Sequence, residues 1–221
     1  MDLNKNLEKY ADLLVRIGLN LHAGDNLTIR LSEDSLPLAR LVAKKAYQAG
    51  VGDIQLMFTD DSITLDRFLE ARDESFETYP EYQVDFAEKL FLDNHHVLSL
   101  LAPNPDLLKP ADPARIAQWQ KVAGMANKRL MKYTMQNKVK WCVAAAACPA
   151  WADAAFPGMP GKAASAHAGQ AAAATHHLTL FCIVYFIKRL FAMPATFCHW
   201  AMRAGSAGLS KSGLGASKLR T

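Results

Sequence analysis

Apolar residues recur first at helical spacing and then at strand spacing along the beginning of the chain. The pattern predicts a helix over residues 3–21, a strand over 27–31, a helix over 35–49 and a strand over 53–58. Gly24 and Gly50 are expected to end the two helices, and Ser35 is expected to cap the second one. A strand, a helix and a strand in this order predict a βαβ unit with parallel strands and a right-handed crossover.

The same alternation continues toward residue 150. It predicts helices over residues 61–70, 86–93 and 114–135, strands over 97–101 and 138–146, and a short helical piece over 149–155. Residues 79–82 read as a break, and the prolines between residues 103 and 113 predict a loop. Helices that alternate with strands indicate an α/β domain with three layers around a mainly parallel sheet.

The composition changes in kind near residue 157. Residues 1–153 contain 18 Lys and Arg against 21 Asp and Glu, whereas residues 154–221 contain 7 Lys and Arg and no carboxylate. Folded surfaces normally mix both signs of charge. Periodicity also ends near Gly158, and Ala, Gly and His dominate the residues that follow. We therefore expect an α/β domain over residues 1–157 and a poorly ordered basic tail over 158–221.

One apolar segment, residues 178–187, interrupts this tail. A membrane span needs about 20 apolar residues, and Lys188 and Arg189 end the segment too early, so no membrane partner is expected. The basic residues lack interleaved aromatic side chains after Trp200, so no nucleic-acid partner is expected either. The start of the chain lacks the short apolar core of a secretory signal, which favours a cytoplasmic protein with reduced thiols.

Residue types that can carry chemistry occur in pairs. Adjacent side chains of an extended chain point in opposite directions, so His95 and His96 are expected in an exposed turn rather than at one metal. Asp60-Asp61 and Asp73-Glu74 lie at predicted turns and helix starts, where carboxylates cap a helix or are solvated by water. Acidic, glycine-free turns follow the first two strands, and no phosphate-binding glycine motif occurs, which disfavours nucleotide binding.

The four cysteines form no close CxxC pair. Cys142 and Cys148 flank a predicted strand end and are expected to be buried and inert. A second group has zinc-ligand residue types but no standard zinc spacing: His176, His177, Cys182, Cys198 and His199. We therefore assign no catalytic, cofactor-binding or metal-binding residue.

Short segments in a fixed order carry a resemblance to a known family. They lie at residues 10–15, 18–21, 24–25, 37–40, 46–50, 60–61, 105–109, 112–113, 133–135, 140–141, 149–152 and 156–157. Each segment by itself is weak evidence of a relationship. Their order and spacing resemble the opening of the thermophilic-type metallo-aminopeptidases, the family that includes aminopeptidase T and aminopeptidase S.

The resemblance implies a cytosolic exopeptidase that releases N-terminal residues from peptides. It implies two divalent metal ions (zinc, cobalt or magnesium) held by Glu, His and Asp side chains, with a metal-bound water attacking a polarised carbonyl. The family's metal ligands and catalytic Tyr belong to a C-terminal domain. The present chain departs from the family at about Gly158, and no ligand can be mapped after Asp153 because Asp and Glu are absent there.

The leading hypothesis is thus an aminopeptidase by descent, truncated before its metal-binding domain and inactive alone. A reading-frame shift or a fusion to non-coding sequence would explain the tail, and a natural short paralogue with a purposeful basic tail is the alternative origin. The alternative function is a non-catalytic interaction or dimerisation module that pairs with itself or with a full-length relative.

Overall fold

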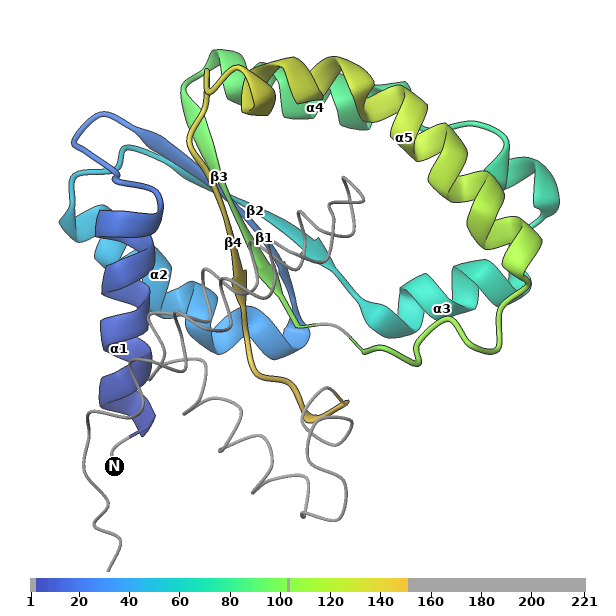
Figure 1. Cartoon of the computed structure of the whole chain (residues 1–221), viewed down its shortest axis with the longest axis horizontal. Coiled ribbons are helices and arrows are strands. Elements are labelled where there is room, and N and C mark those ends of the chain that lie inside the picture. Colours follow the sequence, from blue (N-terminus) through green and yellow to red (C-terminus); the bar gives the residue numbers. More distant parts are fainter. Residues whose placement is uncertain (1–2, 103, 151–221) are drawn as a thin grey trace, which may run out of the picture. The chain divides into compact units, whose positions relative to one another are not determined.

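The computed structural model describes residues 3–102 and 104–150, which belong to one unit within Met1–Ala174. Four strands in these residues form one sheet: β1 (Asn26–Ser32), β2 (Ile54–Thr59), β3 (His95–Leu101) and β4 (Trp141–Ala145). The strand order is β2-β1-β3-β4, and all three pairings are parallel (Figure 1). The mainly parallel sheet expected from the sequence is confirmed.

Helices cover both faces of this sheet. They are α1 (Leu3–Leu13), α2 (Leu36–Gln48), α3 (Asp61–Glu70), α4 (Glu81–Leu92) and α5 (Pro113–Met135). Figure 1 shows α1 and α2 on one side of the sheet and α4 with the end of α5 on the other. Of the two inner strands, β3 is apolar over most of its length, whereas β1 alternates apolar residues with polar ones.

The main hydrophobic core lies between the sheet and the helices α1 and α2. Alternate residues of β1 point into it, namely Leu27, Ile29 and Leu31, together with Leu98 of β3 and Val42 of α2. A smaller cluster on the opposite face joins α4, β3 and α5, with Phe91 and Val97 among its members. The strand β3 therefore contributes to both clusters through its alternating side chains.

A third cluster joins α3 and α5 beside the 3₁₀ turn Asp73–Phe76. Phe68 stacks on Phe76 with ring centroids 5.3 Å apart, and the Arg67 guanidinium lies 3.7 Å from the centroid of the Trp119 ring. Aromatic and cation–π contacts of this kind let a small cluster hold an excursion of the chain away from the sheet.

The first helix is shorter than the sequence pattern predicts. The α-helix ends at Leu13, and a π turn over Leu14–Gly18 replaces its last part. Leu19 and Leu21 follow in irregular backbone but are buried all the same. The apolar pattern in the sequence therefore continues past the point where the helix ends. Gly24, with φ +87°, serves a turn instead of stopping the helix, since its N–H donates to the Gly50 carbonyl at 3.0 Å.

Other boundaries differ by a few residues. The helix predicted over 86–93 begins earlier, at Glu81 directly after Pro80, and β4 is shorter than the strand predicted over 138–146. Ser35 does not cap α2 with its side chain; its hydroxyl accepts from Ser32 N–H and donates to Ser32 C=O, both at 2.9 Å. The piece predicted over 149–155 lies mostly outside the described residues.

Candidate functional site

Ligands of open parallel sheets usually bind beyond the carboxyl ends of the strands. In this domain the turn after β2 carries Asp60 and Asp61. The Asp60 carboxylate accepts the Ile63 N–H at 2.9 Å, so it caps α3 as the sequence predicts. Partial burial raises the pKa of Asp61, and the negative charges of Asp34 and Asp60 raise it further.

The second acidic pair, Asp73-Glu74, also begins a helical segment. Both residues lie in the first turn of a 3₁₀ helix, and the Asp73 carboxylate accepts the Arg115 Nε–H at 2.8 Å. Arg115 additionally donates to the Phe68 carbonyl at 2.9 Å. Arg115 of α5 therefore joins Asp73 to the last part of α3.

The two adjacent histidines are buried, so the expectation of an exposed turn is wrong. His95 and His96 are each 4% exposed and form the first two residues of β3, a strand that lies between β1 and β4. The turn before them is completed by Asn94 with φ +62°. The pattern missed them because polar residues at the start of a central strand resemble a loop when only hydrophobicity is read.

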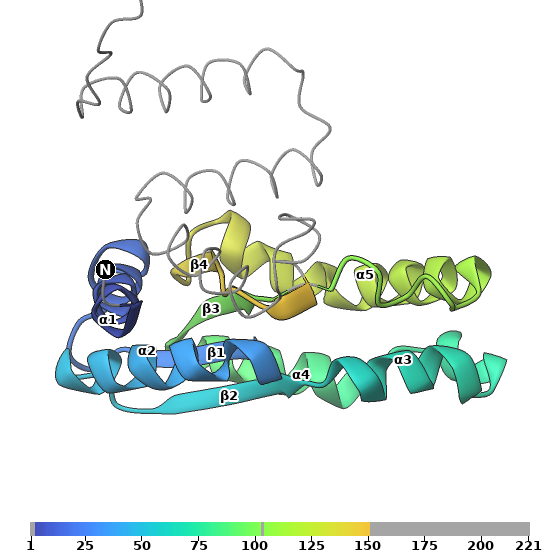
Figure 2. The same ribbon diagram turned by 90° about the horizontal axis from the view of Figure 1, so that it is seen from below.

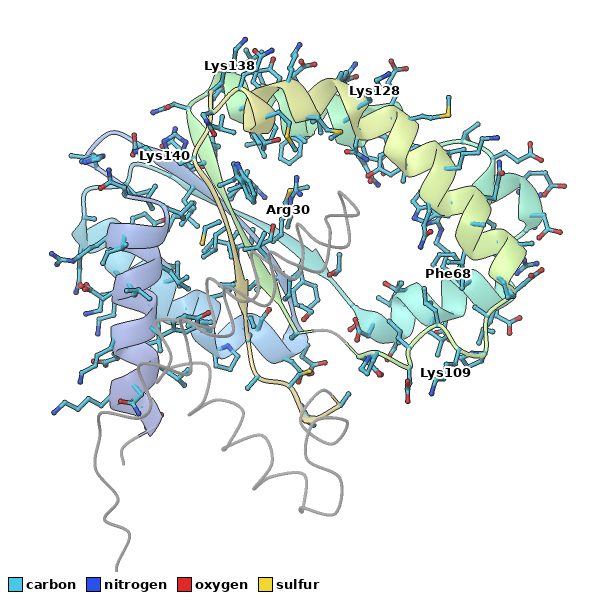
Figure 3. The ribbon with its side chains drawn as sticks, viewed as in Figure 1. Arg30, Phe68, Lys109, Lys128, Lys138 and Lys140 are labelled. Carbon is cyan, nitrogen blue, oxygen red and sulfur yellow. The ribbon has the colours of Figure 1, made fainter. Side chains whose placement is uncertain are left out.

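His96 belongs to a polar network at the amino ends of the strands. Its Nδ1 accepts the Lys140 backbone N–H at 3.3 Å, so Nε2 carries the proton of the neutral ring and lies 3.4 Å from Asp25 Oδ1. The Lys140 ammonium donates to Asp25 Oδ2 at 2.6 Å and to the Asn20 carbonyl at 2.8 Å. Figure 3 places Lys140 at this end of the sheet.

The charges of this network are balanced within it. Burial by itself would raise the pKa of Asp25, but hydrogen bonds from Lys140 and the His22 N–H, with the nearby positive charges, lower it to about 2. Burial lowers the pKa of His96, and the Asp25 charge only partly offsets this. Near neutral pH the network thus contains a carboxylate, an ammonium and a neutral imidazole.

His95, also at the amino ends of the strands, connects β3 to β1 and to the start of β2. Its Nδ1 lies 3.3 Å from the Thr28 hydroxyl of β1, and its Nε2 lies 3.7 Å from Asp53 Oδ2, just before β2. Asn26 bridges the same segments, because its amide donates to the Asp93 carbonyl at 2.8 Å and accepts the Asp53 N–H at 3.0 Å. These bonds align the starts of three strands.

We tested whether this edge fits the divalent metals of the family named by the resemblance. Hard divalent ions prefer several carboxylate oxygens, but the Lys140 ammonium already occupies the side of Asp25 where a cation would bind. The Nδ1 atom of His96 is taken by a backbone N–H. Across the part of the chain that the structure describes, no group of three or more His, Cys, Asp or Glu could hold a metal ion. These residues do not fit the metals.

The two described cysteines are buried, as expected. Burial raises the pKa of Cys142 to about 11, which keeps its thiol protonated and unreactive near neutral pH. A Cβ at Gly18 would lie 3.1 Å from Cys142 Sγ, so the thiol packs directly against the π turn. Cys182, Cys198 and the histidines at 176, 177 and 199 lie outside the described residues.

Comparison with known proteins identifies the family. Residues 3–179 match the family described as Thermophilic metalloprotease (M29), and the chain belongs to this family. Residues 10–15, the first segment of the sequence resemblance, form part of α1 and the π turn that pack against the sheet. The recognition made from short segments is confirmed.

The relatives with curated names are aminopeptidases. Aminopeptidase AmpS of Bacillus subtilis is 36% identical over 155 residues, which are 70% of this chain and 38% of that protein. Aminopeptidase 2 of Geobacillus stearothermophilus is 36% identical over 152 residues, 69% of this chain and 37% of that protein. The chain therefore matches less than two fifths of the length of these relatives.

A solved structure supports the same relationship. Wild-type AmpT from Thermus thermophilus superposes with a TM-score of 0.74 and 26% identity, over 78% of this chain and 43% of that one. No helix in residues 3–102 and 104–150 is long and apolar enough to cross a membrane.

Proposed function

We propose that residues 1–157 are the N-terminal α/β domain of a metal-dependent aminopeptidase, a cytoplasmic enzyme that releases N-terminal residues from peptides. The observation that carries the proposal is the match of this parallel-sheet domain to AmpT, with a TM-score of 0.74. Membership of the metalloprotease family and the two aminopeptidases at 36% identity support it.

We further propose that the present chain does not hydrolyse peptides by itself. A two-metal centre for zinc, cobalt or magnesium requires several carboxylates at one point. All 21 Asp and Glu of the chain lie in residues 1–153, and of those at the strand ends Asp60 already caps a helix and Asp25 already pairs with a cation. Residues 158–221 carry no carboxylate, which supports the proposal that a frameshift or a fusion produced this tail.

A hydrolysis assay on the purified full chain tests this proposal. The substrates are aminoacyl amides with added zinc, cobalt or magnesium, and metal content is measured separately after dialysis. We expect no turnover above a mock purification and no stoichiometric metal, while full-length AmpS of Bacillus subtilis serves as the active control. Turnover that follows the protein through purification and disappears with a chelator would overturn the proposal.

A second candidate function is an interaction module. The observation that favours it is the outer strand of the sheet, where two large apolar side chains, Leu56 and Phe58, are exposed. Exposed apolar groups on an unprotected strand are typical of surfaces that pair with another chain.

A further inference from the structure

Arg30 is a charged residue in an inner strand of the sheet. It belongs to β1, which lies between β2 and β3. Its register partners are Met57 of β2 and Ser99 of β3, so these three side chains share one face of the sheet. Inner strands of parallel sheets are usually apolar because both faces are covered, and a cation at this position is therefore unusual.

The part of the sheet around Arg30 remains accessible. On this face the cluster that joins α4, β3 and α5 includes Val97, which precedes Ser99 in β3. Figure 2 shows α3 and the first part of α5 beyond the carboxyl ends of the strands, and Arg30 extends from the sheet on the side of α5 (Figure 3) and is exposed. Ligands of open parallel sheets bind toward these ends, so a ligand can reach Arg30.

The charge of Arg30 is not balanced by the surrounding protein. Within residues 3–102 and 104–150, no group forms an ion pair or a hydrogen bond with its guanidinium. Burial lowers the pKa of Arg30, and Tyr79, from the segment before α4, raises it only in part. A partly desolvated cation without a counter-ion is unfavourable, and an anionic ligand would relieve this.

The neighbours of Arg30 favour a carboxylate as this anion. A guanidinium is a planar fork that binds a carboxylate through two parallel hydrogen bonds. The Ser99 hydroxyl in the adjacent strand is a further donor, and the half-buried Met57 on the other side offers apolar surface. Neither register partner is a second cation, which a doubly charged phosphate would favour.

We propose that Arg30 binds the C-terminal carboxylate of a short peptide, with the Ser99 hydroxyl as a further donor and Met57 against the last side chain. The inference rests on the proposed aminopeptidase function, which makes peptides the carboxylates that this domain meets. An enzyme that releases N-terminal residues must hold the rest of the peptide, and binding energy from the far end contributes to this. Arg30 is thus a substrate-binding residue that favours short peptides with a free carboxyl end.

Peptide binding to the purified full chain tests the proposal. The chain is expected not to hydrolyse peptides by itself, so binding can be followed at equilibrium by NMR titration, and mass spectrometry verifies that the peptide stays intact. The probes are the tripeptide Leu-Gly-Gly and its C-terminal amide, with acetate and inorganic phosphate as simple anions. The acid should bind at least ~10-fold more tightly than the amide, and the backbone amide signals of Arg30 and Ser99 should shift.

Variants of Arg30 identify the group that makes this difference. Arg30→Met should bind the acid and the amide equally weakly, and Arg30→Lys should keep only part of the preference, because an ammonium lacks the two-bond fork. Arg40→Met, at an exposed arginine of α2, is the matched control and should keep the full preference. Chemical denaturation should find Arg30→Met at least as stable as the unmodified chain, because it removes a desolvated charge without a partner.

Three results would overturn the proposal. The first is equal binding of acid and amide by the unmodified chain, or an unchanged preference in Arg30→Met. The second is acetate or phosphate that binds as tightly as the peptide acid, which would indicate a general anion site. The third is a clear loss of stability in Arg30→Met, which would give Arg30 a structural role. None of them bears on the aminopeptidase proposal, since the hydrolysis assay tests it separately.

Discussion

The two ends of the sheet use the same kinds of residue in different ways. At the amino ends, the Lys140 ammonium reaches the Asp25 carboxylate across 115 residues of sequence. At the carboxyl ends, the Asp60 carboxylate binds a backbone N–H only three residues away. The first contact ties distant segments together, whereas the second only starts a helix, so their energetic roles should differ.

The electrostatics of the two ends differ as well. The amino ends contain a balanced pair, with the pKa of Asp25 lowered to about 2. At the carboxyl ends, partial burial raises the pKa of Asp61, and the negative charges of Asp34 and Asp60 raise it further. Titratable residues that gather at one end of a parallel sheet can therefore have a structural role. This role depends on the end of the sheet at which they lie and on the partners that they contact.

The largest expected effect comes from removing the cation at the amino ends. Lys140→Met should lower the free energy of unfolding by about 2 to 3 kcal/mol, because it leaves a largely buried carboxylate without its charged partner. Chemical denaturation at pH 7 measures this, with the exposed Lys138→Met as control. An equal loss in the two variants would show that the network does not join the strands.

Acid should weaken the amino ends next. The folded-state pKa of Asp25 lies below its ordinary value, so its contribution is present above pH ~4 and is lost as the pH falls toward 2. Asp25→Asn should therefore cost about 2 kcal/mol at pH 7 and almost nothing at pH 2. Denaturation curves from pH 2 to 7 measure this difference, with Asp12→Asn, at a carboxylate that pairs with Arg16 on the surface of α1, as the control.

At the carboxyl ends, Asp60→Ala should cost about 1 kcal/mol through loss of the helix cap. Asp60→Asn keeps an acceptor for the Ile63 N–H and should cost only a few tenths of that. Thermal unfolding of the two variants separates the cap from the charge. If both variants lost the same stability, the carboxylate charge rather than the cap would be responsible.

The smallest expected effect is at Asp61. Its folded-state pKa is raised, so its charge costs stability above that pKa and nothing once it is protonated. Asp61→Asn should stabilise the domain by less than ~0.5 kcal/mol at pH 7, since the α3 dipole partly favours the charge. The gain should vanish below pH ~4. A gain that persisted in acid would rule out charge repulsion.

Local signals in the sequence were enough for most of the fold. Helix α3 has the bounds expected from its capping aspartate and periodicity, and α5 begins one residue earlier than expected, at Pro113. Gly50, with φ +91°, lies after α2 as expected. These features depend on neighbouring residues, so they can be read without knowing the tertiary structure.

Features that depend on distant partners could not be read in this way. The burial of His95 and His96 follows from Thr28, Asp25 and Lys140, which lie 44 to 71 residues away in sequence. At the end of the π turn, Gly18 lies close to Cys142, a residue far away in sequence. The sequence contains all of these residues, but no local pattern in it indicates which of them are in contact.

The long span of the Lys140–Asp25 contact has a consequence for the order of folding. The pairing of β1 with β2 closes a short loop and can form early, because loop-closure entropy grows with sequence separation. The carboxylate of Asp25 and the ring of His96 stay without Lys140 until the residues before β4 have left the ribosome. A nascent chain therefore exposes the free edge of β3 until residue 145 has left the ribosome, and β4 then completes the described sheet and its charge balance together.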